Sequence, residues 1–153
     1  MKKLEGKNII VELIPNHSNP ECGDVVQLQA LKLNNLELID RFDYRVVDRF
    51  IENKDLLAMI SYDKDKFDYV ENPKNILKDF KRWSKGYKLL IIDNFYTLDY
   101  LREFNNKESI FNYLDMTFSN DVIDQIITKY HLEPSNHIVD LLYEALIYSS
   151  NKE

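Results

Sequence analysis

The stretch that decides the fold is residues 8–33, NIIVELIPNHSNPECGDVVQLQALKL, which predicts two strands joined by a loop. Its first part, residues 8–14, is a nearly continuous apolar run interrupted by Glu12, and such a β-branched run is typical of a strand buried on both faces. Its last part, residues 25–33, alternates apolar and polar side chains, which predicts a strand with one face in solvent. The prolines, asparagines and glycine between these parts predict a loop.

The rest of the chain continues this pair into a series of strands and helices. After the turn at Asn34-Asn35, residues 36–46 predict a third strand, so we expect the first three strands to form an antiparallel meander. Residues 47–71 are expected to be irregular, and residues 87–92 predict a buried strand. Helices are expected at residues 72–86, 97–104, 120–130 and 136–149.

The helix that begins at Asn72-Pro73 has two different faces. Its apolar residues recur at helical spacing and predict the buried face: Ile76, Leu77, Phe80 and Trp83. The opposite side carries five basic residues, here called the basic stripe: Lys74, Lys78, Lys81, Arg82 and Lys85. Because such charge patterning is common on solvated helices, we expect a solvated face first and keep nucleic-acid or partner binding as the alternative.

Composition narrows the classes of protein to which the chain can belong. Its 153 residues suffice for one domain over residues 1–153 with a core of its own. No apolar run reaches membrane-spanning length and the first residues lack the apolar core of a signal peptide, so we expect a cytoplasmic protein with no membrane contact. The net charge of −6 argues against a general nucleic-acid coat. With Cys22 as the one cysteine, an intramolecular disulfide and a cysteine-rich zinc site are excluded.

The order of these elements resembles that of the DEDDh (DnaQ-like) 3′–5′ exonucleases, the proofreading type of the ribonuclease-H-like fold. Residues 24–30, DVVQLQA, are similar to the D-x-I-I-Q-I-G-A strand of that family, and the ordered series of elements covers nearly the whole chain. The resemblance implies an α/β protein with the ribonuclease-H-like exonuclease fold, a mixed sheet of about five strands flanked by helices.

The resemblance also identifies the positions where the family's chemistry would stand. The family binds two divalent metal ions through four carboxylates and uses a histidine as general base. In its D-x-E motif, Glu12 stands at the Asp and Ile14 at the Glu; a register shifted by two places Glu12 at the Glu instead, and either way one acid is missing. The ligand positions of H-N-x-x-F-D and H-x-x-x-x-D are Leu98 and Leu142, and His137 stands at the general base.

The substitutions at these positions are all apolar, which indicates a site that has abandoned metal. Carboxylates crowded together without metal repel one another, so apolar replacement stabilises such a site. We therefore expect no catalytic residue, no metal ligand and no cofactor, with Mg²⁺ or Mn²⁺ relevant only if residual activity persists. The former metal pocket should be filled by side chains, and Glu12 should contact a basic residue or lie at an exposed edge.

These observations leave more than one function open. The first hypothesis is a catalytically inactive pseudo-exonuclease that binds a protein partner, such as a nucleic-acid-processing enzyme, because ten tyrosines and an acidic charge suit a protein interface. The second is a pseudo-nuclease that binds single-stranded nucleic acid through the basic stripe. The third is a weakly active metal-dependent exonuclease that uses, in altered geometry, Glu12, Asp99, His137 and either Asp140 or Glu144. The resemblance is also compatible with a homodimer.

Overall fold

The computed structural model of the chain describes residues 5–47, 49, 51, 53–60, 67–93, 96–108, 112–118, 120–132 and 138–151. Within these residues six strands form one mixed sheet in the order β4-β3-β2-β1-β5-β6. The strands are β1 (Lys7–Pro15), β2 (Val25–Asn34), β3 (Glu37–Val46), β4 (Asp68–Val70), β5 (Lys88–Ile92) and β6 (Asn112–Phe118). The helices are α1 (Lys54–Ile60), α2 (Lys74–Trp83), α3 (Thr97–Glu108), α4 (Asn120–Tyr130) and α5 (Ile138–Asn151).

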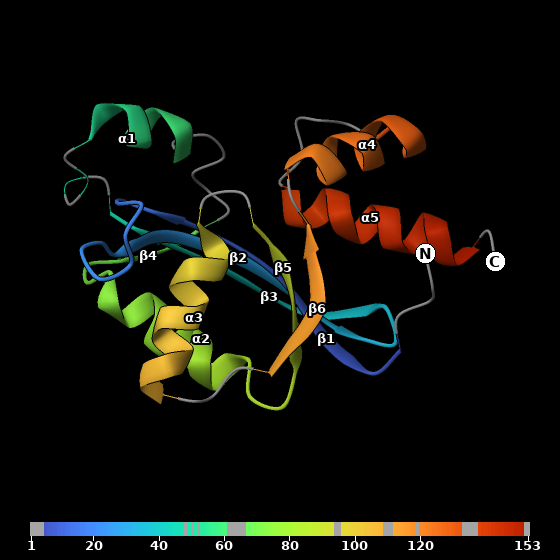
Figure 1. Cartoon of the computed structure of the whole chain (residues 1–153), viewed down its shortest axis with the longest axis horizontal. Coiled ribbons are helices and arrows are strands. Elements are labelled where there is room, and N and C mark those ends of the chain that lie inside the picture. The colour runs from blue at the N-terminus through green and yellow to red at the C-terminus, as the bar shows by residue number, and fades with distance from the viewer. Residues whose placement is uncertain are drawn as a thin grey trace.

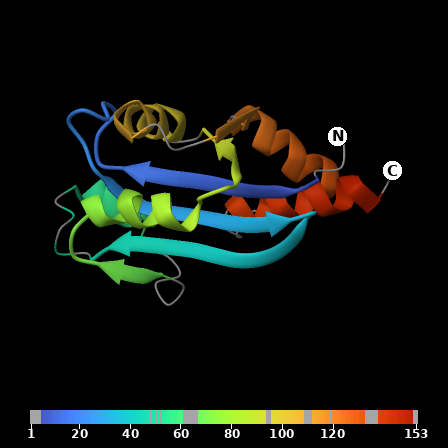
Figure 2. The ribbon, with the colours of Figure 1, turned by 90° about the horizontal axis from the view of Figure 1, so that it is seen from below.

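The first three strands form the antiparallel meander that the sequence predicts (Figure 2). Asn35 and Leu36 connect β2 to β3 with φ angles of 49° and 67°, as a two-residue hairpin turn of the primed type requires. The side-chain oxygen of Asn35 accepts a hydrogen bond from the backbone N–H of Gly6 at 2.6 Å, which ties this turn to the start of β1. Strands β5 and β6 then run parallel to β1 beyond its other edge.

Helices cover both faces of the sheet (Figure 1), which explains the burial of β1 on both sides. On one face Val11 and Leu13 belong to a core cluster with residues of α1, α2 and α3. On the other face Ile10 belongs to a cluster with residues of α4 and α5, among them Leu142. In the part of the chain that the structure describes, no helix is both long and apolar enough to cross a membrane.

The prediction that one face of the second strand lies in solvent is wrong. Gln27 and Gln29 are each only 3% exposed, although both are polar positions in the alternating pattern of β2. β2 lies inside the sheet between β1 and β3, and the side chain of Gln29 donates a hydrogen bond to Asp43 on β3 at 3.0 Å. A buried polar partner on the next strand therefore replaces the water that the sequence pattern suggested.

The segment expected to be irregular, residues 47–71, contains α1 and β4. The three residues of β4 pair in parallel with the end of β3, from Tyr44 opposite Asp68 to Val46 opposite Val70. This pairing partner is more than twenty residues away in the sequence, so the local pattern carries no signal for it. With β4, the sheet has one strand more than the five or so that the sequence predicts.

The two faces of α2 are as the sequence predicts. Its first turn is capped by Asn72, whose side-chain oxygen accepts the backbone N–H of Lys74 at 3.0 Å. Ile76 and Phe80 are fully buried, and Leu77 and Trp83 pack against the same core while remaining half-buried. This apolar face holds the helix against β2 and β3.

Candidate functional site

A row of buried polar side chains crosses three neighbouring strands on the face that α5 covers. The strand register places Glu12 of β1 opposite Gln29 of β2, and Gln29 opposite Asp43 of β3. All three side chains are buried, and Gln29 Nε2 donates a hydrogen bond to Asp43 Oδ1 at 3.0 Å. This polar row (Glu12, Gln29 and Asp43) contains Glu12, the acidic position of the first exonuclease-like motif.

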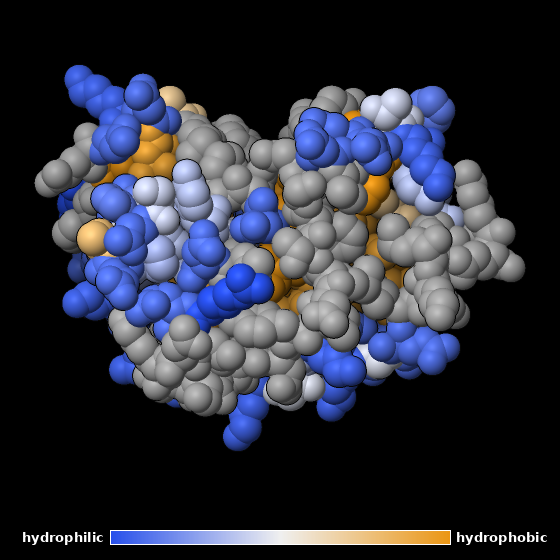
Figure 3. All heavy atoms as spheres, viewed as in Figure 1, coloured by the Kyte–Doolittle hydropathy of each residue, from blue (hydrophilic) through white to orange (hydrophobic). Residues whose placement is uncertain are grey.

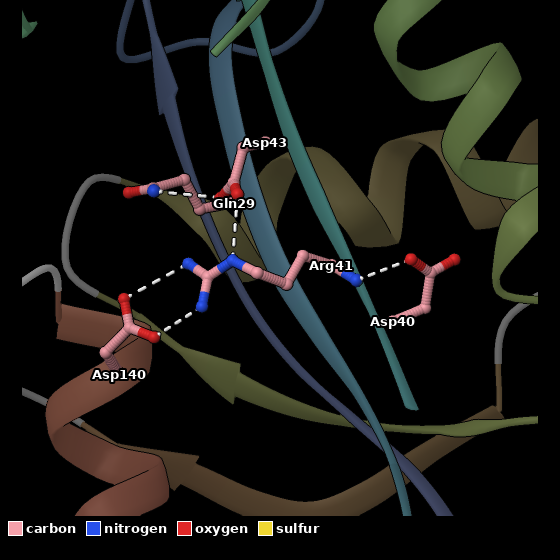
Figure 4. Close-up of polar contacts among 5 residues, drawn as sticks. All are labelled: Gln29, Asp40, Arg41, Asp43 and Asp140. Carbon is pink, nitrogen blue, oxygen red and sulfur yellow. Dashed lines mark hydrogen bonds and ion pairs between the residues drawn. The ribbon is translucent and has the colours of Figure 1, made fainter. Parts of the chain in front are cut away.

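Arg41 joins the polar row to α5 (Figure 4). Its Nε donates to Asp43 Oδ2 at 3.0 Å, while Nη1 and Nη2 donate to the two carboxylate oxygens of Asp140 at 2.6 and 3.2 Å. Such a two-point contact between a guanidinium and a carboxylate is the strongest common geometry for an ion pair. The contact fixes α5 relative to β3.

The electrostatics of this contact favour the charged form of the arginine. The hydrogen bond from Arg41 to Asp140 is the largest cause that raises the pKa of the guanidinium. Partial burial opposes it by lowering that pKa, and the hydrogen bond to Asp43 raises it again. The guanidinium is therefore a permanent positive charge between two carboxylates, which neutralises much of the negative charge beside the polar row.

The two described apolar replacements at the ligand positions both lie in the core. Ile14 is 6% exposed and packs in the cluster with α1, α2 and α3, whereas Leu142 is 0% exposed and packs in the cluster of α4 and α5. The sequence predicted that side chains fill one former metal pocket. The structure does not bring Ile14 and Leu142 together in such a pocket, because each belongs to a different core cluster. Leu98 lies in the first turn of α3, but its side chain and the whole of His137 are outside the described residues.

The remaining acidic candidates are dispersed. Glu12 is buried within the sheet and does not lie at an exposed edge. Asp140 is bound to Arg41, Glu144 is half-buried farther along α5, and Asp99 is exposed on α3. Among the described residues, no group of three or more His, Cys, Asp or Glu side chains is arranged to hold a metal ion.

Sequence reasoning missed Arg41 and Asp43. The available signal was the alternation in β3, where Arg41, Asp43 and Arg45 occupy one face and Phe42 and Tyr44 the other. Because strands at the edge of a sheet commonly place charged residues in solvent, this pattern gave no reason to expect a buried network. Only the docking of α5 against that face brings Asp140 to Arg41.

The basic stripe lies on the solvent side of α2, as its spacing predicts. Lys74, Lys78, Arg82 and Lys85 are exposed and Lys81 is half-buried. Arg82 Nη1 lies 4.0 Å from Asp79 Oδ1 on the same helix, so an acidic residue interrupts the stripe. Hydrophilic side chains cover much of the described surface on the left of the view in Figure 3, and hydrophobic surface shows in smaller areas between them.

Comparison with known proteins finds a likeness in structure but not in sequence. The chain matches no family model and no curated protein. A product-bound structure of exonuclease I matches with a TM-score of 0.56 and 8% identity, over 97% of this chain and 45% of that chain. Two further structures have TM-scores of 0.47: the zinc-bound E. coli ExoI–ssDNA complex (10% identity, 87% of this chain, 31% of that chain) and exonuclease I in its apo form (11%, 87%, 32%).

The match to the product-bound structure shows that the chain has the α/β ribonuclease-H-like exonuclease fold, which confirms the predicted fold class. The chain spans less than half the length of the exonuclease I structures that it matches.

Proposed function

We propose that this chain is a non-catalytic exonuclease-like domain that acts by binding a protein partner, a nucleic-acid-processing enzyme. The proposal rests on the side chains that stand at the positions aligned with the family's metal ligands. Ile14 and Leu142 are core residues there, and Asp140, two residues before Leu142 on α5, is bound by Arg41.

The chemistry of two-metal catalysis explains why this arrangement favours a non-catalytic domain. The reaction needs carboxylates that hold two cations about 3.5–4 Å apart. To use Asp43 or Asp140 as a ligand, the protein would have to break charge-assisted hydrogen bonds to Arg41. The released guanidinium would then repel the arriving metal ions, which makes the present pairing the more stable state.

A protein partner is favoured by the outer edge of the sheet. Three large hydrophobic or aromatic side chains on β3 and β4 are exposed: Leu38 (37%), Ile39 (52%) and Tyr69 (41%). Leu38 and Ile39 are neighbours at the start of β3, whereas Tyr69 lies opposite Arg45 at the other end of that strand. Exposed apolar and aromatic side chains along the sheet edge of an acidic protein are typical of a protein-binding region. The net charge of −6 makes the chain as a whole a poor general binder of nucleic acid.

The first test is a nuclease assay on a labelled single-stranded DNA oligonucleotide with Mg²⁺ or Mn²⁺, paired with a thermal melt in the same metal. We expect no trimming of the oligonucleotide. We also expect no rise in Tm, because Tm would rise only if the metal ion bound the folded state. Trimming that disappears in Glu12→Ala would overturn the proposal.

The second test is affinity capture with the tagged protein and with Ile39→Lys. We expect a defined partner to be retained by the unmodified protein and lost with Ile39→Lys. Tyr148→Lys is the matched control, because Tyr148 is also an exposed large side chain but lies on α5. Capture of no specific partner would contradict the proposed mode of action.

The exposure of the basic stripe supports binding of a single nucleic-acid strand as the second candidate function. Its test is binding of a labelled single strand at several salt concentrations by the protein and by Lys74→Gln/Lys78→Gln. Binding that weakens with salt and falls in this variant would favour the second function. Binding that is absent or insensitive to salt would remove it.

A further inference from the structure

A groove lies beside α2 on the face of the sheet opposite the polar row, where β3 meets β4. Its volume is about 430 Å³, within the usual range for sites that accept a side chain or a small molecule. Aromatic residues of β3 and α2 line it: Phe42, Tyr44 and Trp83. Aspartates from three elements also line it: Asp40 of β3, Asp68 of β4 and Asp79 of α2.

The aromatic rings form a packed floor. The rings of Phe42 and Tyr44 are stacked with their centroids 4.1 Å apart and an angle of 12° between their planes. Trp83 lies with its centroid 5.3 Å from that of Phe42. Phe42 is buried beneath its neighbours, whereas Tyr44 and Trp83 are half-buried and present part of their surface to the groove.

The charge of the groove is negative. Among the described residues that line it, three are aspartates and two are arginines. The guanidinium of Arg41 is turned to the other face of the sheet, where it binds Asp43 and Asp140 (Figure 4). Arg82 is largely exposed with its Nη1 4.0 Å from Asp79 Oδ1, so one guanidinium faces three carboxylates. Burial is the largest cause that raises the pKa of Tyr44, and the charges of Asp68, Asp79 and Asp40 raise it further. The three carboxylates therefore act electrostatically on the same aromatic ring, that of Tyr44.

The ammonium group of Lys32 already binds to part of this surface, at Trp83. The Nζ of Lys32 lies 4.4 Å from the centroid of the Trp83 ring and donates a hydrogen bond to the Trp83 carbonyl oxygen at 2.6 Å. Lys32 is also opposite Asp40 in the strand register, and the indole N–H of Trp83 donates to Asp40 at 2.9 Å. The combination of aromatic face and carboxylate thus binds a positive group within the fold itself.

We propose that this groove docks an arginine-bearing segment of the protein partner, an inference that rests on the proposed function. A planar guanidinium stacks on an aromatic face and binds carboxylates at two points, which an ammonium group does less well. The entering guanidinium would stack on Tyr44 and bind Asp68 and Asp79. A phosphate backbone would be repelled by the same carboxylates, so charge complementarity favours a basic peptide over nucleic acid.

Trp83 makes the proposal directly measurable because it is the only tryptophan in the chain. The probe is a terminally blocked hexa-arginine peptide, titrated into the full chain at about 0.15 M salt, where long-range charge effects are screened. We expect a saturable change in tryptophan emission. In Asp68→Asn/Asp79→Asn the apparent Kd should rise by about tenfold or more, since two charge-assisted contacts are lost.

The control separates the groove from the general acidity of the protein. Asp99→Asn/Asp121→Asn removes the same charge from two exposed aspartates on α3 and α4, and it should leave the Kd within about twofold of that of the unmodified protein. Circular dichroism establishes that both double variants are folded.

Three results would overturn the docking proposal. They are the absence of a saturable change, an equal loss of affinity in the two double variants, and a change in Trp83 emission produced by an oligo-dT strand in place of the peptide. Metal-dependent trimming in the nuclease assay would instead overturn the proposed function. The two failures are therefore distinguishable.

Discussion

Arg41 of β3 and Asp140 of α5 form a two-point ion pair although they are 99 residues apart in the sequence. The same guanidinium also binds Asp43, so one side chain connects the third strand, the polar row and the last described helix. Asp140 is two residues before Leu142 on α5, the position that the sequence resemblance aligns with a metal ligand. The guanidinium of Arg41 thus binds both Asp43 and Asp140.

Removal of Arg41 should destabilise the fold. Arg41→Met leaves the partly buried Asp43 and Asp140 without their shared cation, and we expect the free energy of unfolding to fall by about 2–3 kcal/mol. Urea unfolding followed by circular dichroism measures it. Arg49→Met is the control, because the Arg49–Glu71 pair is exposed on both sides and should contribute at most about 1 kcal/mol. Equal losses in the two variants would show that the Arg41 contacts contribute no more to stability than an exposed ion pair does.

Restoring acids at the apolar ligand positions should damage the protein and not revive a metal site. Ile14→Glu and Leu142→Asp each place a carboxylate in the core, and each should lower the free energy of unfolding by more than about 3 kcal/mol. Ile14→Val is the matched control and should cost about 1 kcal/mol. Thermal melts with and without Mn²⁺ provide the measurement. A double variant whose Tm rises in Mn²⁺ would mean that a metal site persists in the fold.

Tyr100 should make the stability of the protein fall at alkaline pH. Its hydroxyl donates a hydrogen bond to the backbone oxygen of His17 at 2.5 Å. Burial first, then the negative charges of Asp24 and Cys22, raise the pKa of Tyr100 to about 12. The unfolded state therefore loses this proton first, near pH 10 or so, and stability declines as the pH rises from about 10 toward 12.

Urea unfolding of Tyr100→Phe at several pH values tests this prediction. Below about pH 10 the variant should be less stable by about 1 kcal/mol, because the hydrogen bond to His17 is lost. At higher pH this difference should shrink, since only the unmodified protein carries the ionising group. Tyr148→Phe, in which the replaced ring is exposed, is the control. Parallel profiles of Tyr100→Phe and the unmodified protein would refute the assignment.

Gly23 should not tolerate a larger residue, because neighbouring atoms leave no space for a Cβ atom. A Cβ atom there would collide with the hydroxyl of Tyr100 and would lie 2.6 Å from the Cβ of His17 and 2.9 Å from Oδ1 of Asn16. We expect Gly23→Ala to cost about 1–3 kcal/mol of unfolding free energy.

The control for Gly23→Ala is Gly86→Ala, which meets no atom within 4 Å but must adopt a φ of +84°. It should cost about 1 kcal/mol through backbone strain alone. Adding Tyr100→Phe to Gly23→Ala should regain part of the loss, because the nearest obstructing atom is removed. Strictly additive losses in the double variant would contradict the packing argument.

Much of the fold follows from local pattern. The apolar run at β1 and the apolar spacing of α2 predict these elements and their buried faces. The alternation in β2 predicts a strand but not the burial of its polar face. The cap at Asn72 follows from local backbone chemistry in the same way. The turn lies at Asn35 and Leu36, one residue beyond the predicted Asn34-Asn35, and places Leu36 at a φ of 67°, which local preference disfavours for a leucine. In contrast, β4 exists through pairing with a distant strand, and the burial of Gln29 depends on Asp43 of another strand.

The sequence by itself determined the fold class, the order of the main elements and the apolar character of Ile14 and Leu142. Local periodicity and residue chemistry are properties of single segments, so they are readable without coordinates. The tertiary structure alone decided that Ile14 and Leu142 lie in different core clusters, that Arg41 binds Asp140, and that aspartates from β3, β4 and α2 meet over Tyr44 and Trp83. These relationships arise when helices and strands far apart in the sequence dock on one sheet, and no local pattern encodes that contact.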